Sequence, residues 1–282
     1  MRKPLRYMTS RFIGAAAAIG IAAMTLACPA RAQSPRDSGG TSADDLLAIQ
    51  LYLVGGGFVP FSTGSNVTGI DVNAGTNTSL PGGTSSVTPL VGARIHVPML
   101  WYMHDEQHLG ASIFFETGLQ SGLSNQSLLQ AFQGTSATAQ DFGSQVVREY
   151  WQVPVLLGVT VPVAGGSSTP WALLDLYGGV TLDSWGQVLQ GGESAAPGQQ
   201  GFYSENRRLT LDPTVGIGLR MPVGHLDDDL PIFVGMNAEL QFRPGSVVQA
   251  ASQNFPVNYI GTVGPHPDLV VMARIGIAFG GR

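Results

Sequence analysis

The chain has 282 residues, of which 44% are hydrophobic and 12% are charged, and it contains one cysteine. After residue 32 nine basic residues stand against nineteen acidic ones, which leaves a net charge of −10 and no lysine. This balance argues against nucleic acid as a partner, because no basic patch is available to neutralise phosphates. The lack of cysteine in the same region excludes a disulfide framework.

The N-terminus has the layout of an export signal. Four basic residues occupy the first eleven positions, an alanine-rich apolar run follows at 12–27, and Ala30-Arg31-Ala32 forms a small-x-small cleavage site. This pattern predicts a secretory signal peptide over residues 1–32, followed by a short linker at 33–45. Lipidation of Cys28 is the alternative, although the residue three positions before it is threonine rather than the usual leucine.

The remainder, residues 46–282, reads as one β domain built from segments in which apolar and polar residues alternate. In the segment around Trp151, the odd positions Trp151, Val153 and Val155 are apolar, whereas the even positions include Gln152 and Pro154. Side chains on a strand alternate between faces, so each such segment is predicted to be a strand. Each is about long enough for a tilted membrane strand, which needs roughly 9–11 residues. The eight segments are 46–61, 89–102, 108–119, 147–162, 171–185, 207–222, 231–243 and 268–279.

The connections between these segments alternate regularly between long and short. Long loops rich in Gly, Ser, Thr and Asn fill 62–88, 120–145, 186–206 and 244–267. Short turns fill 103–107, 164–170 and 223–230. This alternation is typical of an up-and-down barrel in an outer membrane, with brief turns on the periplasmic side and extended loops outside. A soluble β-sandwich has no reason to sort its loops in this way.

The polar faces of the segments favour a membrane barrel over a soluble fold. They carry glycines and isolated charges without lysine, whereas the water-facing side of a soluble sheet is usually dense in Lys and Glu. We therefore expect the aliphatic faces to contact lipid and the charges to line a narrow lumen. Only a closed barrel satisfies every backbone group of strands in a bilayer. The predicted fold is all-β, an eight-stranded antiparallel up-and-down transmembrane β-barrel.

Three stretches carry a resemblance to a known family: Tyr150-Trp-Gln-Val-Pro-Val-Leu-Leu157, the glycine-rich strand centres Gly178-Gly179 and Gly216-Ile-Gly218, and the last strand Val271 to Phe279. The chain resembles the eight-stranded outer-membrane barrels of the OmpA/OmpX type, the outer membrane protein β-barrel domain family. The resemblance implies the outer membrane of a Gram-negative bacterium, contact with outer-membrane lipids and lipopolysaccharide, and insertion by the barrel assembly machinery. The chain departs from the family's usual aromatic terminus, since Gly280-Gly281-Arg282 follows Phe279.

The charges on the inward faces are the main candidate site. Eight strands enclose a space that side chains largely fill, and a lone charge there is costly, so the charges should pair. A salt-bridged plug that fixes the strand register is the favoured interpretation. A gated pore with exchanging pairs, or a proton-linked relay, is the sharper alternative. The predicted lumen charge network consists of Arg94, Glu116, Arg148, Asp175, Asp183, Asp212, Arg220, Glu239, Arg243 and Arg274.

The motifs for metal binding and catalysis are weak. His104 and His108 lie four apart, but the zincin pattern requires Glu directly after the first His, where this chain has Asp105. The acidic run 227–229 lacks the glycine and the later glutamate of a calcium loop. A grouping of Ser252, His266 and Asp268 rests on residue type alone. No catalytic residue, metal or cofactor is predicted, and the protein is predicted not to be an enzyme.

The long loops carry aromatic residues that are candidate contacts with an extracellular ligand, unless they pack loop against loop. These residues are Phe132, Phe142, Phe202, Tyr203, Phe255 and Tyr259. The sequence thus predicts a non-enzymatic outer-membrane barrel with a structural or surface-interaction role. One alternative is a narrow gated channel for small solutes or ions. The other is a lipid-modifying enzyme or protease at the barrel rim.

Overall fold

A computed structural model describes most of the chain after residue 47. Thirteen β-strands lie within the described residues, and these residues contain no helix long and apolar enough to cross a membrane. The predicted signal peptide, the linker and Cys28 lie outside them. The described ranges are 48–60, 66–71, 77–81, 87–105, 108–123, 127–133, 142–166, 169–191, 202–226, 230–251 and 257–279.

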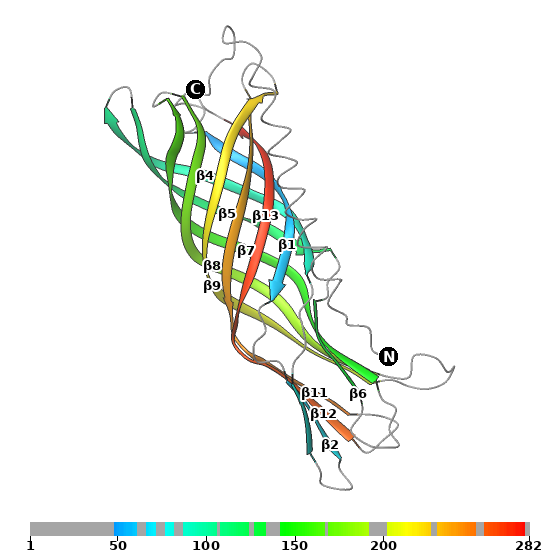
Figure 1. The fold of residues 1–282 in the computed structure, drawn as a ribbon. Coiled ribbons are helices and arrows are strands. Elements are labelled where there is room, and N and C mark those ends of the chain that lie inside the picture. Colours follow the sequence, from blue (N-terminus) through cyan, green and yellow to red (C-terminus); the bar gives the residue numbers. More distant parts are fainter. Residues whose placement is uncertain are drawn as a thin grey trace, which may run out of the picture.

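Eight of the strands form a closed antiparallel ring, which confirms the predicted fold. Each strand pairs with its neighbours along the chain, the first and last strands pair with each other, and β5 pairs with both β4 and β7. The ring appears as the long tilted barrel in Figure 1. All eight predicted segments are present in it. Its strands are β1 (Ile49–Pro60), β4 (Thr88–Asp105), β5 (His108–Gly122), β7 (Phe142–Gly166), β8 (Thr169–Gly191), β9 (Phe202–His225), β10 (Pro231–Arg243) and β13 (His266–Phe279).

The distribution of polarity is inverted relative to a soluble protein. Aliphatic side chains point outward along every strand of the ring; Leu157, for example, is 58% exposed. The alternate positions point inward and are polar, and Glu239 in the barrel interior is fully buried. An outward apolar band around a polar interior is the arrangement of a transmembrane barrel.

Glycines allow the strands to bend tightly around this small ring. A Cβ added to Gly118 would lie 2.2 Å from the carbonyl oxygen of Ala93 on the neighbouring strand. A Cβ on Gly179 would lie 2.2 Å from the carbonyl oxygen of Val155. No side chain fits at such distances, so strand curvature at these points requires glycine.

At one end, here called the outer end, the barrel opens into two facing sheets. Strands β11 (Ser246–Ala251), β12 (Val257–Val263), β2 (Asn66–Asp71) and β3 (Asn77–Pro81) pair in that order. These four strands have the same order as the four barrel strands to which the chain connects them: β11 follows β10, β12 precedes β13, β2 follows β1 and β3 precedes β4. Figure 1 shows this second sheet beyond the barrel. The opposite wall continues through the long strands β7 to β9, to which β6 (Ser127–Gln133) adds an edge.

The two sheets enclose an apolar core, here called the outer sandwich core. It contains Val67, Leu189, Val248, Ala250 and Tyr259, and a second group of Val147, Trp185 and Val263 lies buried as well. This corrects the prediction that the long connections are loops, because β2, β3, β6, β11 and β12 lie in them. Their scattered apolar residues alternate and bury one face of each strand.

Candidate functional site

Buried ionisable side chains fill the barrel interior in two groups, each defined by its ion pairs. The first, the mid-barrel block, consists of Arg94, Glu116, Asp175, Arg220, Glu239 and Arg274. The second, the outer acidic cluster, consists of Arg243 with Glu149, Asp183, Asp212, Asp268 and His266.

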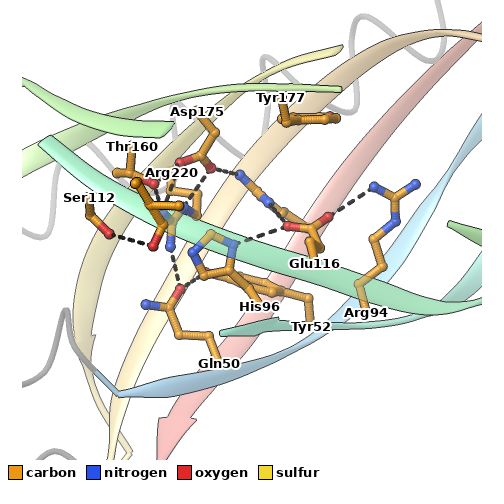
Figure 2. A network of polar contacts seen from close by, with 12 residues as sticks. Gln50, Tyr52, Arg94, His96, Ser112, Glu116, Thr160, Asp175, Tyr177 and Arg220 are labelled. Carbon is orange, nitrogen blue, oxygen red and sulfur yellow. Dashed lines mark hydrogen bonds and ion pairs between the residues drawn. The ribbon is translucent and has the colours of Figure 1, made fainter. Parts of the chain in front are cut away.

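The mid-barrel block is a continuous chain in which cations and anions alternate, and Figure 2 shows the part of it around Arg94, Glu116, Asp175 and Arg220. Arg94 bridges two carboxylates, donating from Nη2 to Glu239 at 2.9 Å and from Nη1 to Glu116 at 3.0 Å. Arg274 continues the chain from Glu116, at 3.4 Å, to Asp175, at 2.6 Å. Arg220 closes it by donating to both oxygens of Asp175, at 2.6 and 2.8 Å.

Neutral side chains make further hydrogen bonds to the block. Arg220 also donates to Gln50 at 2.6 Å and to Thr160 at 2.7 Å. The Tyr177 hydroxyl donates to Glu239 at 3.0 Å, and the His96 ring lies 3.2 Å from Glu116.

Every strand of the ring contributes to this one network. Because each contributor comes from a different strand, a slip of any strand would break the chain of ion pairs. The network therefore specifies the register of the barrel. The contributors are Gln50 (β1), Arg94 (β4), Glu116 (β5), Thr160 (β7), Asp175 (β8), Arg220 (β9), Glu239 (β10) and Arg274 (β13).

The outer acidic cluster surrounds one guanidinium with carboxylates. Arg243 lies 2.6 Å from Glu149, forms a short contact with Asp183, and lies 3.2 Å from Asp268 and 3.7 Å from Asp212. The rings of Phe58 and Trp185 pack over the guanidinium, with centroids at 4.8 and 4.7 Å, and are in range for cation–π contacts.

The charges in this cluster do not balance. One arginine faces four carboxylates, all of them buried, and His266 reaches the cluster through a 3.2 Å contact with Asp268. Both carboxylate oxygens of Asp212 lack a hydrogen-bond partner. The cluster thus holds more carboxyl groups than cationic groups, whereas the mid-barrel block pairs three arginines with three carboxylates.

One predicted member of the network is wrong. Arg148 faces the outside of the barrel, where its side chain lies 3.7 Å from Glu205 and donates to the Tyr203 hydroxyl. A register shift between Glu149 and Trp151 reverses the alternation that the sequence suggested, so that Glu149 points inward in its place. The other nine predicted members of the network lie buried in the interior.

Four interior members were not in the predicted network, namely Glu149, Asp268, His266 and His96. The register shift hides Glu149 from any simple count of alternate positions. In contrast, Asp268 and His266 lie an even number of residues from the inward-facing Arg274, and His96 lies two residues from Arg94, so the alternation would have found all three.

The aromatic contact candidates divide into several cases. Tyr203 is exposed on β9, where it is available for contacts. Tyr259 is fully buried in the outer sandwich core, which corrects its assignment as a surface contact. Phe132, Phe142 and Phe202 fall in strands β6, β7 and β9, and Phe255 lies outside the described residues.

The described residues give no support to the weaker motifs. His104 falls at the end of β4 and His108 at the start of β5. Ser252 and the run 227–229 lie outside the described residues. Where the chain is described, no three His, Cys, Asp or Glu side chains are arranged to hold a metal ion.

Comparisons with known proteins give little beyond architecture. No family model matches the chain, and no curated protein matches it. Among solved structures, the chain is similar to the outer membrane protease OmpT from Escherichia coli, with 9% identity and a TM-score of 0.32. The match covers 87% of this chain and 100% of that one. A match to a protease contradicts the prediction that the chain is not an enzyme, which is withdrawn. At this similarity the match assigns no activity to the chain.

Proposed function

We propose that the protein is an outer-membrane β-barrel of the OmpA/OmpX type with a structural and surface-interaction role. In this proposal the barrel is closed to solutes and carries the outer sandwich at the cell surface. The mid-barrel block is the observation that carries the proposal. A network that takes one side chain from each of the eight strands leaves no strand free to move away from the axis without breaking buried ion pairs.

The outward surface supports the membrane location. Exposed aliphatic residues run along β9 from Val223 to Leu209, and Trp171 and Phe242 stand exposed at opposite ends of the apolar band. Aromatic residues at both borders of such a band are typical of the membrane interface. Lipids of both leaflets are the partners that this surface fits.

Closure of the interior at several levels supports a sealed barrel over the gated-channel alternative. The buried side chains of Leu173 and Phe233 lie toward the inner end, and the mid-barrel block follows. The outer acidic cluster and the outer sandwich core close the other end. Conduction would require buried ion pairs to separate, which costs several kcal/mol for each unpaired charge.

Planar bilayer recordings test the sealed barrel. We expect no conductance steps from the refolded chain. The double variant R220A/D175A removes the side chains that tie β8 and β9 to β1 and β7, and it serves as the opened counterpart. Discrete steps from the unaltered chain would show that the interior conducts and would refute the proposal.

Cysteine labelling of whole cells tests the orientation. The only native cysteine lies in the predicted signal peptide, so single introduced cysteines give clean signals. Tyr203 is 56% exposed near the outer end, and Leu226 is 65% exposed between β9 and β10 at the inner end. Y203C should react with a membrane-impermeant maleimide on intact cells, and L226C only after lysis. The reverse pattern would place the sandwich in the periplasm.

A further inference from the structure

The arginines on the outside of the barrel have a restricted distribution. Seven arginines are described, and four of them belong to the two interior groups. Arg208 points to the seam between β9 and β11, where it donates to the carbonyl of Gly245 at 2.8 Å. The remaining two, Arg148 and Arg207, face outward. Among the described residues the outer surface thus carries its arginines at one place.

These two arginines lie in one row across three strands. Arg148 on β7 is level with Gly186 on β8, which is level with Arg207 on β9. Gly186 contributes no side chain, and the position between the two arginines holds the Glu205 carboxylate and the Tyr150 ring, which a Cβ on Gly186 would meet at 2.9 and 3.4 Å. Adjacent strands lie about 4.8 Å apart, which places the two backbones roughly 10 Å from each other, within reach of one ligand group.

The row lies at the border of the apolar band. Leu209 and Leu211 are exposed on β9, and Arg207 is the next outward position. On β7, Trp151 ends the apolar series, and Arg148 lies just beyond the register shift. In a membrane this level is the junction between hydrocarbon and headgroups, where Trp and Arg side chains concentrate.

The side chains around the row hold the cations in place without neutralising both. The guanidinium of Arg207 stacks over the Tyr150 ring at 4.1 Å. The hydroxyls of Tyr150 and Tyr203 both donate to Glu205, which lies 3.7 Å from Arg148. Two cations and one carboxylate leave a net positive charge. The Nε of Arg148 is buried and has no hydrogen-bond partner, so a donor at this position is unused.

We propose that Arg148 and Arg207 form a binding site for the phosphate of a phosphorylated glycolipid in the outer leaflet, of the lipid A type. Guanidinium groups bind phosphate through paired, charge-assisted hydrogen bonds. The position at the border lets the acyl chains of the same lipid lie along Leu209 and Leu211. The proposal rests on the outer-membrane location proposed above, and it adds a specific lipid contact to the general one.

Native mass spectrometry of the refolded mature chain in detergent micelles tests this site. The probes are lipid A with two phosphates, lipid A without phosphate, and inorganic phosphate as a competitor. We expect the bisphosphorylated lipid to be retained by the unaltered chain. The double variant R148Q/R207Q should lose about tenfold in affinity, and R148K/R207K should keep only part of it, because an ammonium group retains the charge but not the paired donors of a guanidinium. E205Q should bind more tightly, because it removes the competing carboxylate.

The outcomes separate this site from the proposed function. The site would be overturned, and the barrel left intact, if the chain shifted in gel mobility on heating, as a folded barrel does, but bound lipid A with and without phosphate alike. The same conclusion would follow if both double variants bound the bisphosphorylated lipid as tightly as the unaltered chain. If millimolar inorganic phosphate displaced the bound lipid as effectively as added free lipid does, free phosphate would be the ligand. That result would overturn the lipid assignment. Failure to fold into micelles or vesicles would instead count against the membrane location.

Discussion

The Arg220→Met substitution gives the sharpest test of the mid-barrel block. Methionine keeps much of the length of the side chain but removes four hydrogen bonds, two to Asp175 and one each to Gln50 and Thr160. Breaking a buried ion pair by removing one partner costs about 3–5 kcal/mol. We expect the free energy of unfolding to fall by this amount, measured by urea titration in phospholipid vesicles with tryptophan fluorescence. Arg207→Met, the same change on the outer surface, should cost less than about 1 kcal/mol.

A second substitution determines whether charge or packing is responsible. In R220M the block has two arginines for three carboxylates, so adding Asp175→Asn restores neutrality. If the loss in R220M comes from an orphaned buried charge, the double variant R220M/D175N should recover about 1–2 kcal/mol, despite carrying two changes. A double variant less stable than R220M would refute this reasoning. So would an R220M chain within about 1 kcal/mol of the unaltered one.

Three further predictions concern other parts of the barrel. Asp212→Asn should raise the free energy of unfolding by about 1 kcal/mol at neutral pH, because it removes one of four crowded carboxyl groups, and a loss in the same urea titration would contradict the idea that their crowding is destabilising. Gly179→Ala should lower it by about 1–3 kcal/mol, since the new Cβ would lie 2.2 Å from a carbonyl oxygen of β7. Gly178→Ala is its control, with 3.5 Å to the nearest atom, and equal losses would count against the packing argument. The double variant N206A/R208A removes two side-chain bonds from β9, one to the carbonyl of Val247 in β11 and one to that of Gly245 just before it. Hydrogen exchange should then speed up in β11 and β12 but not in the ring, and unchanged exchange would mean that the core alone holds the sandwich.

The ring of the barrel was predictable because one physical rule acts along the whole band. Every outward position must be apolar and every inward position must suit a narrow polar interior, so the sequence alternates strictly. Beyond the band the rule no longer holds. Strand β7 begins at Phe142, five residues before its predicted start, in a stretch where outward positions such as Ser144 need not be aliphatic.

The outer sandwich was not predictable from the same pattern. Strand β11 alternates over six residues, Ser-Val-Val-Gln-Ala-Ala, in which only Val248 and Ala250 form its buried apolar face. Small residues can fill this thin core because the two sheets face each other closely. A connection rich in Gly, Ser and Thr then looks like a loop, although alternate residues of β11 are buried as in any sheet.

The interior network was predictable wherever the strands are regular and not where they are irregular. A β-bulge places two residues opposite one on the partner strand, so every position beyond it changes face. The shift at Tyr150 exchanges Arg148 for Glu149, and it reverses the sign of the charge that enters the barrel at that level. No residue type in this stretch marks the bulge, since Glu149, Tyr150 and Trp151 each fit an ordinary strand.

The same bulge explains how a surplus of carboxylates is tolerated at the outer level. Arg243 directly follows Phe242, the last exposed apolar residue of β10, so the outer acidic cluster lies at the border of the band. At this level Glu149 lies on the inner face of the wall, and Arg148 and Arg207 lie on the outer face. At about 10 Å and an effective dielectric constant near 20, each opposite pair across the wall attracts by on the order of 1–2 kcal/mol. In the middle of the band the outer face is aliphatic and offers no such charge. The mid-barrel block must therefore be neutral by itself, and its three arginines and three carboxylates meet that condition.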